Sequence, residues 1–356
     1  MACTLCPRPR GFDEEGDPVS GIADVARRAG VSKSTASRAL SGNGYVSEIT
    51  RAKVVAAAST MGYVVSTNAS SLVTGQTHNV GILTPFINRW FFAEVLEGIE
   101  SALIAAGYDL TLYRLSPNAA RRRRVFDYFL VRKRVDAVIA VGIALSPSEI
   151  GLLHGLRKPI AGIGGAIEGI STLSIDDVAA SRMATEHIIG LGHTRIMHFG
   201  GDQDEQMDFV VHAQRLAGFR SALADAGIAQ GDDFRVAPFS IPGGFEAGLA
   251  VLADPRSRPT AIVAGCDEIA IGVILAARQL GIQVPQQLSV VGLDDHDLAE
   301  MFGLTTLRQE PGRQGRLAVE LIMGQLSSPD DEWAAHAHTV PVTMLVRSST
   351  TAPPAV

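Results

Sequence analysis

Cysteine is scarce in this chain, with three residues among 356: Cys3, Cys6 and Cys266. So few cysteines cannot supply the disulfide framework on which small secreted proteins depend. Long apolar runs are also missing, since none approaches the roughly 18–20 residues that a membrane-spanning helix needs. The first twenty residues contain no apolar stretch of the kind found in secretory signal peptides. These absences predict a cytoplasmic protein with no membrane partner.

Motifs for catalysis and metal binding are missing as well. The sequence has no GxxxxGK[ST] phosphate loop and no GxSxG elbow, and GIGG at residues 162–165 lacks the dinucleotide-binding pattern. Cys3 and Cys6 form a CxxC pair without the second pair that a zinc site needs. His336 and His338 lack helical spacing, so we assign no metal to them. We expect no cofactor, no metal and no enzyme activity.

Charge is distributed unevenly along the chain. The formal net charge is −6, and the apolar content of 46% is that of a globular protein. Residues 20–75 nevertheless hold six Lys and Arg against two Asp and Glu, whereas the residues that follow are acidic. A basic N-terminal module attached to an acidic body suggests that the module binds a polyanion.

Three short helices are predicted within residues 20–66, after a tail over residues 1–19 that we expect to be disordered. Gly30 interrupts the first helical pattern, and Ser32 is a good N-cap for a second helix. That second helix would place Lys33, Ser34 and Arg38 on one side, where they suit the major groove of DNA. The alternative is an ordinary helical hairpin with a solvated charged face.

The remainder of the chain repeats a different unit. Residues 67–77 (TNASSLVTGQT) are small and polar, as in a linker. From NVGILTP at Asn79 to LSVVGLDD at Leu288, near-continuous apolar strands alternate with helices. This alternation predicts parallel sheets that are covered on both faces. There are too many strands for one small sheet, so we expect two α/β subdomains.

The stretch IADVARRAGVSKSTASRAL, residues 22–40, resembles the headpiece of the LacI/GalR family of bacterial transcription regulators. The resemblance continues in order through VSEITRAKVVAAASTMGY, SSLVTGQTHNVGIL, LGHTRIMHFGG, VPQQLSVVGLDD and PVTMLVRSST. It implies an all-α helix-turn-helix headpiece and an α/β body with two doubly wound parallel-sheet subdomains of the periplasmic-binding-protein type. The expected boundaries are a DNA-binding domain at 20–66, a hinge at 67–77, an N-terminal core subdomain at 78–178 and 309–338, and a C-terminal core subdomain at 179–308 and 339–350.

The resemblance also implies a DNA-binding site. In the family, hinge helices of a dimer wedge leucines into a central base step, and Leu72 matches that leucine. Taken alone, Leu72 would rather be an anchor onto the body. Val65, Ser66 and Ser70 depart from the family's hinge pattern, which implies fewer phosphate donors. The implied contacts are Ser32, Lys33, Ser34, Thr35, Ser37, Arg38, Asn43, Ala69 and Leu72.

A cleft for a small effector is implied between the two subdomains. Arginine, aspartate and aromatic rings together are the chemistry of sugar or polyol recognition. The alternatives are a structural ion pair between Arg215 and Asp294, and plain core positions for the rings. Cys266 and Gly164 replace polar residues that are usual in the family. The implied effector contacts are Phe91, Phe92, Gly164, Arg215, Phe239, Cys266 and Asp294.

These observations predict a homodimeric transcription regulator, most simply a repressor. Its affinity for a pseudo-palindromic DNA operator would be controlled by a sugar or sugar derivative. Two alternatives are a solute receptor without a DNA role and a sugar-active enzyme. The basic run Arg121 to Arg124 is interpreted as a solvated helix face, with a second anionic contact as the alternative.

Overall fold

The computed structural model describes residues 21–41, 44–63, 76–116, 118–130, 135–202, 211–229, 231–328 and 334–354. The chain divides into two compact units, at residues 1–77 and 78–356, and each is described by itself. No helix within these ranges is both long enough and apolar enough to cross a lipid bilayer.

The described residues of the N-terminal unit form a module of three helices. Gly30 ends the first helix in the left-handed conformation (φ 68°), which glycine adopts without steric cost. The Ser32 hydroxyl accepts the Thr35 N–H at 3.1 Å, so the expected N-cap of the second helix is confirmed. Val25, Ala36 and Val54 contribute to the small core. The helices are α1 (Ile22–Ala29), α2 (Lys33–Ser41) and α3 (Glu48–Thr60).

The body contains two six-stranded sheets. The first has the order β11-β5-β4-β3-β1-β2 and is parallel throughout. The second has the order β12-β10-β9-β8-β6-β7, in which only β12 is antiparallel to its neighbour. The strands are β1 (Asn79–Thr84), β2 (Asp109–Arg114), β3 (Ala137–Val141), β4 (Ile160–Ile163), β5 (Ser171–Ser174), β6 (Ile196–Gly200), β7 (Phe234–Val236), β8 (Ala261–Ala264), β9 (Ser289–Asp294), β10 (Thr305–Arg308), β11 (Ala337–Thr339) and β12 (Thr343–Leu345).

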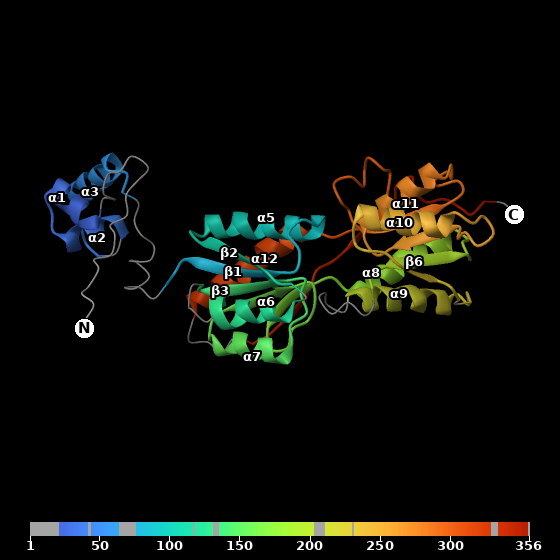
Figure 1. The fold of residues 1–356 in the computed structure, drawn as a ribbon, viewed down its shortest axis with the longest axis horizontal. Helices are drawn as coiled ribbons and strands as arrows, with labels where there is room; N and C mark the ends of the chain where they lie inside the picture. The colour runs from blue at the N-terminus through green and yellow to red at the C-terminus, as the bar shows by residue number, and fades with distance from the viewer. Residues whose placement is uncertain are drawn as a thin grey trace, which may run out of the picture. The chain divides into compact units, whose positions relative to one another are not determined.

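Helices cover both faces of each sheet (Figure 1). In the first subdomain α5 packs with α12 on one face, while α6 and α7 lie on the other. In the second, α8 packs with α9 and α10 packs with α11. The helices are α5 (Trp90–Ala105), α6 (Ala119–Arg124), the π-helix η1 (Val125–Leu130), α7 (Pro147–Gly155), α8 (Asp177–Gly190), α9 (Val211–Asp225), α10 (Ile241–Leu252), α11 (Asp267–Gln279) and α12 (Pro311–Ser327).

The chain crosses between the two sheets three times. It passes from β5 to α8, returns from β10 to α12, and crosses again from β11 to β12. Strand β11 extends to Thr339, one residue beyond the boundary expected for the first subdomain. In open α/β sheets the loops after the carboxyl ends of the strands hold the ligand. A ligand site is therefore expected among those loops.

The basic run Arg121 to Arg124 is not uniformly solvated. Three of the four side chains are exposed, but Arg122 is half-buried. Its Nη2 donates to Glu149 Oε2 at 2.8 Å and also to the backbone oxygen of Ala144. The prediction of a solvated face is therefore wrong for Arg122, because this side chain pins the loop after β3.

Candidate functional site

The second helix of the headpiece, α2, presents a polar face to solvent. Ala36 and Ala39 pack into the core, whereas Ser32, Lys33, Ser34, Ser37 and Arg38 are exposed and Thr35 is half-buried. Arg38 Nε donates to the Ser34 backbone oxygen at 3.3 Å, which leaves the outer edge of its guanidinium able to contact a base. Arg51 donates to the Ala39 carbonyl at 3.0 Å and fixes the end of α2 on α3.

Several predicted DNA contacts lie outside the described residues. These are Asn43, Ala69 and Leu72, together with the hinge departures Val65, Ser66 and Ser70. Their roles stay predictions from the resemblance.

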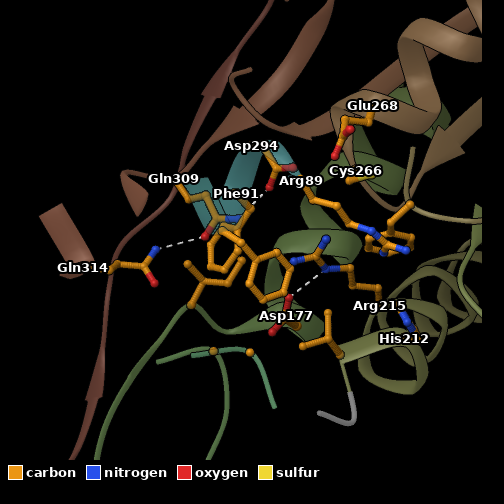
Figure 2. A pocket seen from close by; sticks show the side chains of 16 residues that line it. Arg89, Phe91, Asp177, His212, Arg215, Cys266, Glu268, Asp294, Gln309 and Gln314 are labelled. Atoms are coloured by element: carbon orange, nitrogen blue, oxygen red, sulfur yellow. Dashed lines mark hydrogen bonds and ion pairs between the residues drawn. The ribbon is translucent and has the colours of Figure 1, made fainter. Parts of the chain in front are cut away.

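A cavity in the body lies where strands of both sheets end (Figure 2). Asp294 is the last residue of β9, and Cys266 and Gln309 follow β8 and β10 closely. Gly142 and Gly164 each follow a strand of the first sheet directly. The space open to the centre of a water molecule is about 90 Å³. The lining residues are Arg89, Phe91, Phe92, Gly142, Gly164, Ile175, Asp177, Val211, His212, Arg215, Phe239, Cys266, Glu268, Asp294, Gln309 and Gln314.

Arg215 is held rigidly at one side of this cavity. Its Nε donates to Asp177 Oδ1 at 2.7 Å, and its Nη1 donates to the backbone oxygen of Gly265. Both side chains are buried, with exposed fractions of 8% and 5%. Burial lowers the pKa of Arg215, but the carboxylates of Asp177 and Asp294 outweigh it and raise the pKa. Arg215 is therefore charged, and its ion-pair partner is Asp177, whereas the alternative to an effector contact was an ion pair with Asp294.

Asp294 belongs to a second hydrogen-bonded network. Gln309 Nε2 donates to Asp294 Oδ1 at 2.6 Å, and Gln314 Nε2 donates to Gln309 Oε1 at 3.0 Å. The backbone of Asp294 has φ 133°, and that of Asp295 has φ 61°. Residues other than glycine rarely adopt these backbone conformations, and such backbone strain is concentrated at functional sites. Arg347 donates to Asp295 at 2.6 Å and holds the strained turn in place.

Aromatic rings form the apolar part of the wall. Phe91 and Phe92 meet edge to face with centroids 5.4 Å apart, and Phe239 meets His212 at 4.6 Å. Gly142 leaves room for the ring of Phe92, because a Cβ at position 142 would come within 2.5 Å of that ring. Gly164 has φ 94°, so a side chain at that position would be strained. The positive φ at position 164 therefore accounts for the glycine that stands there in place of the family's polar residue.

The cavity carries several carboxyl groups besides Asp177. Burial, and then the Asp294 carboxylate, raise the pKa of Glu268 to about 7. Burial also raises the pKa of Asp294, although Arg215 and Gln309 oppose this shift. Behind the wall, burial and Asp294 raise the pKa of Asp267, which accepts the Thr306 hydroxyl at 2.7 Å. Burial is the largest cause of each raised pKa, and neighbouring carboxylates add to it.

All seven residues that the family resemblance predicted as effector contacts line this cavity. Gln309 and Asp177 were missed, although each follows a strand closely and the carboxyl-end rule points to such positions. The sequence analysis also missed Glu268, which lies two residues after Cys266, and Arg89, which lies two residues before Phe91. His212 and Gln314 sit within helices, where the sequence offers no signal for them.

Comparison with known proteins identifies the family of this chain. Residues 21–66 match the family model described as bacterial regulatory proteins, lacI family. Residues 185–350 match the periplasmic binding protein-like domain. The ribose operon repressor of Escherichia coli (strain K12) is 34% identical over 314 residues, which cover 86% of this chain and 93% of that repressor. The chain belongs to the lacI family.

Further relatives of this lacI-family regulator, and solved structures of similar proteins, agree with this assignment. The HTH-type transcriptional repressor PurR of Pectobacterium atrosepticum is 33% identical over 92% of this chain and 96% of its own. The lac repressor dimer bound to operator and the anti-inducer ONPF shares the fold, with a TM-score of 0.81 over 94% of this chain and 99% of that one, at 24% identity. A LacI family regulator from Enterococcus faecium with bound ribose has a TM-score of 0.67 at 25% identity, covering 77% of this chain and 99% of that one.

These matches include the headpiece as well as the body. The chain is therefore a DNA-binding transcriptional regulator, and the solute-receptor and enzyme alternatives no longer apply.

Proposed function

We propose that this regulator is a cytoplasmic repressor that binds a pseudo-palindromic operator as a homodimer. A small, neutral, hydroxylated effector in the cavity of the body changes its affinity for that operator. The observation that carries the proposal is one cavity in which Arg215, Asp294 and the ring of Phe91 face the same space (Figure 2). A dimer is part of the proposal because one headpiece reads only half of a palindromic site.

The limited free space and the lining of the cavity favour a monosaccharide. Only about 90 Å³ is open to the centre of a water molecule, which leaves less room for a disaccharide than for a pentose. Sugar rings have apolar faces that pack on aromatic side chains and hydroxyls that both donate and accept. Phe91 and Phe239 supply the rings, whereas Asp294 and Gln309 supply the polar groups. The ribose-related relatives support a pentose.

The charge of the cavity favours a neutral effector. The wall contains two arginines, Arg89 and Arg215, and the charge of Arg215 is already neutralised by its ion pair with Asp177. Asp294 and Glu268 add further carboxyl groups, and burial, followed by the neighbouring carboxylates Asp177 and Asp294 respectively, raises their pKa values. A phosphate or carboxylate on the sugar would add to this charge, so we expect sugar phosphates and sugar acids to bind more weakly than the neutral sugar.

A thermal-shift panel tests the proposed effector. D-ribose, other pentoses, cellobiose, ribose 5-phosphate, sugar acids and nucleobases would be added to the purified chain. We expect a neutral pentose to raise the melting temperature, since a ligand at 100 times its Kd adds about 2.7 kcal/mol of stability. Cellobiose and the phosphate should have little effect. A larger shift with the phosphate or the disaccharide would overturn the proposed effector class.

Gel shifts on a genomic fragment library test the operator side. We expect fragments with an inverted repeat to be selected, and the same pentose to change their apparent Kd. Selection without symmetry would contradict the dimeric reading of the operator.

Replacement of Leu72 with alanine is expected to reduce DNA bending. In the proposed function two such leucines, one per protomer, unstack a central base step, and unstacking costs a few kcal/mol that the side chains repay by packing between the bases. Operator affinity should fall, and the mobility of circularly permuted fragments should vary less with the position of the site. A bend equal to that of the unchanged protein would remove the wedge from the mechanism. Leu40→Ala, in which the changed side chain packs against the headpiece core from α2, would control for general loss of headpiece packing.

A further inference from the structure

Two rings meet across the cleft of the body. The indole of Trp90 lies on the imidazole of His296, with ring centroids 5.0 Å apart and an angle of 31° between the ring planes. Trp90 is the first residue of α5, which packs on the first sheet, whereas His296 follows β9 of the second sheet by two residues. Centroid separations of roughly 4.5–7 Å are typical of favourable ring pairs. This contact therefore joins the two subdomains directly.

The ring pair lies beside the effector cavity. Arg89 and Phe91 flank Trp90 in the chain, and Asp294 lies two residues before His296; all three neighbours belong to the cavity wall. Trp90 and His296 are themselves half-buried. The pair is thus at the rim of the cavity, where the two subdomains meet.

Each ring is held in place by its own subdomain. His296 Nδ1 accepts the backbone N–H of Leu298 at 3.0 Å, which fixes the orientation of the imidazole. On the other side, the guanidinium carbon of Arg89 lies 3.6 Å from the centre of the Phe86 ring and holds the segment before Trp90. Closure of the body therefore brings together two surfaces that are already ordered, which reduces the entropy cost of their contact.

We propose that Trp90 and His296 form a latch between the two subdomains, and that both are positioning residues for the effector site. The first turn of α5 carries Phe91 and Phe92, so a contact that fixes Trp90 also fixes the wall that these rings form. The inference rests on the proposed function for its link to the effector, but the latch itself requires no effector. Opening of the body separates the two rings.

The latch has a cost that keeps it reversible. The Nε1 atom of Trp90 is buried and has no hydrogen-bond partner within the part of the chain that the structure describes. A buried donor without an acceptor is unfavourable, by an amount comparable to the gain from a pair of aromatic rings. The ring contact therefore does not close the body by itself, and contacts with an effector can decide between the open and closed forms.

The fluorescence of Trp90 tests the latch without effector or DNA. The chain has two tryptophans, Trp90 and Trp333, so a Trp333→Phe background isolates the emission of Trp90. In that background we expect His296→Ala to raise the acrylamide quenching constant about twofold, because the indole loses its cover and more of the population is open. His296→Phe keeps a ring at this position, so its quenching constant should stay near that of the unchanged side chain.

Titration with D-ribose as the probe tests whether the latch acts on the effector site. Trp90→Ala and His296→Ala should each raise the Kd about fivefold, since the ring pair no longer favours the closed body. The double variant should bind no more weakly than either single variant, because both changes remove the same contact. Trp90→Phe keeps a ring and removes the unpaired Nε1–H, so its Kd should not exceed that of the unchanged chain.

His78→Ala is the matched control for the loss of a histidine ring contact. The rings of His78 and Tyr108 have centroids 5.1 Å apart, but both residues belong to the first subdomain. This variant should therefore leave the Kd for D-ribose unchanged.

Three results would overturn the inference: additive losses of affinity in the double variant, a Trp90→Phe variant as weak as Trp90→Ala, or quenching that His296→Ala leaves unchanged. If D-ribose fails to bind the unchanged chain, the proposed effector is wrong, while the quenching measurement still decides whether the latch forms.

Discussion

Replacement of Arg38 with alanine is expected to abolish selective binding to the operator. Arg38 is exposed on α2, and its guanidinium is oriented by the Ser34 carbonyl. A bidentate contact from arginine to guanine contributes about 1–3 kcal/mol of discrimination, so a dimer loses about 2–6 kcal/mol. That loss approaches the roughly 4–10 kcal/mol that separates specific from non-specific binding. Fluorescence anisotropy with operator and scrambled DNA at fixed salt would measure it.

The matched control for this change is Lys53→Ala. Lys53 is exposed on α3 and carries the same charge within the same module. We expect this control to lower the affinity for operator and for scrambled DNA about equally, as loss of one phosphate contact does. Arg38→Ala should leave effector binding intact, because the cavity belongs to the other unit of the chain. Equal losses in R38A and K53A would remove Arg38 from the base-reading residues.

The headpiece was predictable because its structure is determined locally. Ser32 as a cap and Gly30 in a positive-φ turn are signals within a few residues of the helices that they delimit. The central strands of the body were predictable for a similar reason, since they are short and mainly apolar runs such as NVGILT or SVVGLD. Burial on both faces makes most positions of such strands apolar and their pattern simple. Edge strands such as β11 (AHT), which is exposed throughout, have no such pattern.

The cavity was predictable only in part. Phe91, Arg215 and Asp294 were selected through the family resemblance, and the structure brings them to one space. The partner of Arg215 could not be predicted from the sequence, because Asp294 ends one strand and Asp177 closely follows another, so that either carboxylate could reach the arginine. The burial of Arg122 could not be predicted for the same reason. Its partner Glu149 is 27 residues away along the chain, and the two charges meet only in the folded subdomain.

Replacement of Arg215 with alanine should remove effector binding and also destabilise the body. The change leaves the Asp177 carboxylate buried without its 2.7 Å partner, and breaking a buried pair costs about 3–5 kcal/mol. It also removes the donor for the Gly265 carbonyl. Loss of binding in this variant alone would therefore not distinguish recognition from unfolding. Chemical denaturation monitored by circular dichroism would give the free energy of unfolding of each variant.

The double variant Arg215→Gln with Asp177→Asn separates the two effects. Both residues become neutral and keep polar ends, so no charge is left buried without a partner, and most of the stability should return. Effector binding should nevertheless stay lost, because the cationic donor is gone. Arg182→Gln on α8 is the matched control: the carboxylates that it pairs with, Glu186 and Asp225, are 51% and 64% exposed, so the change should have little effect on the free energy of unfolding. If the stable double variant binds the pentose as tightly as the unchanged chain, Arg215 only supports the cavity, and the hydroxyls of the effector must be recognised by the Asp294 and Gln309 network instead.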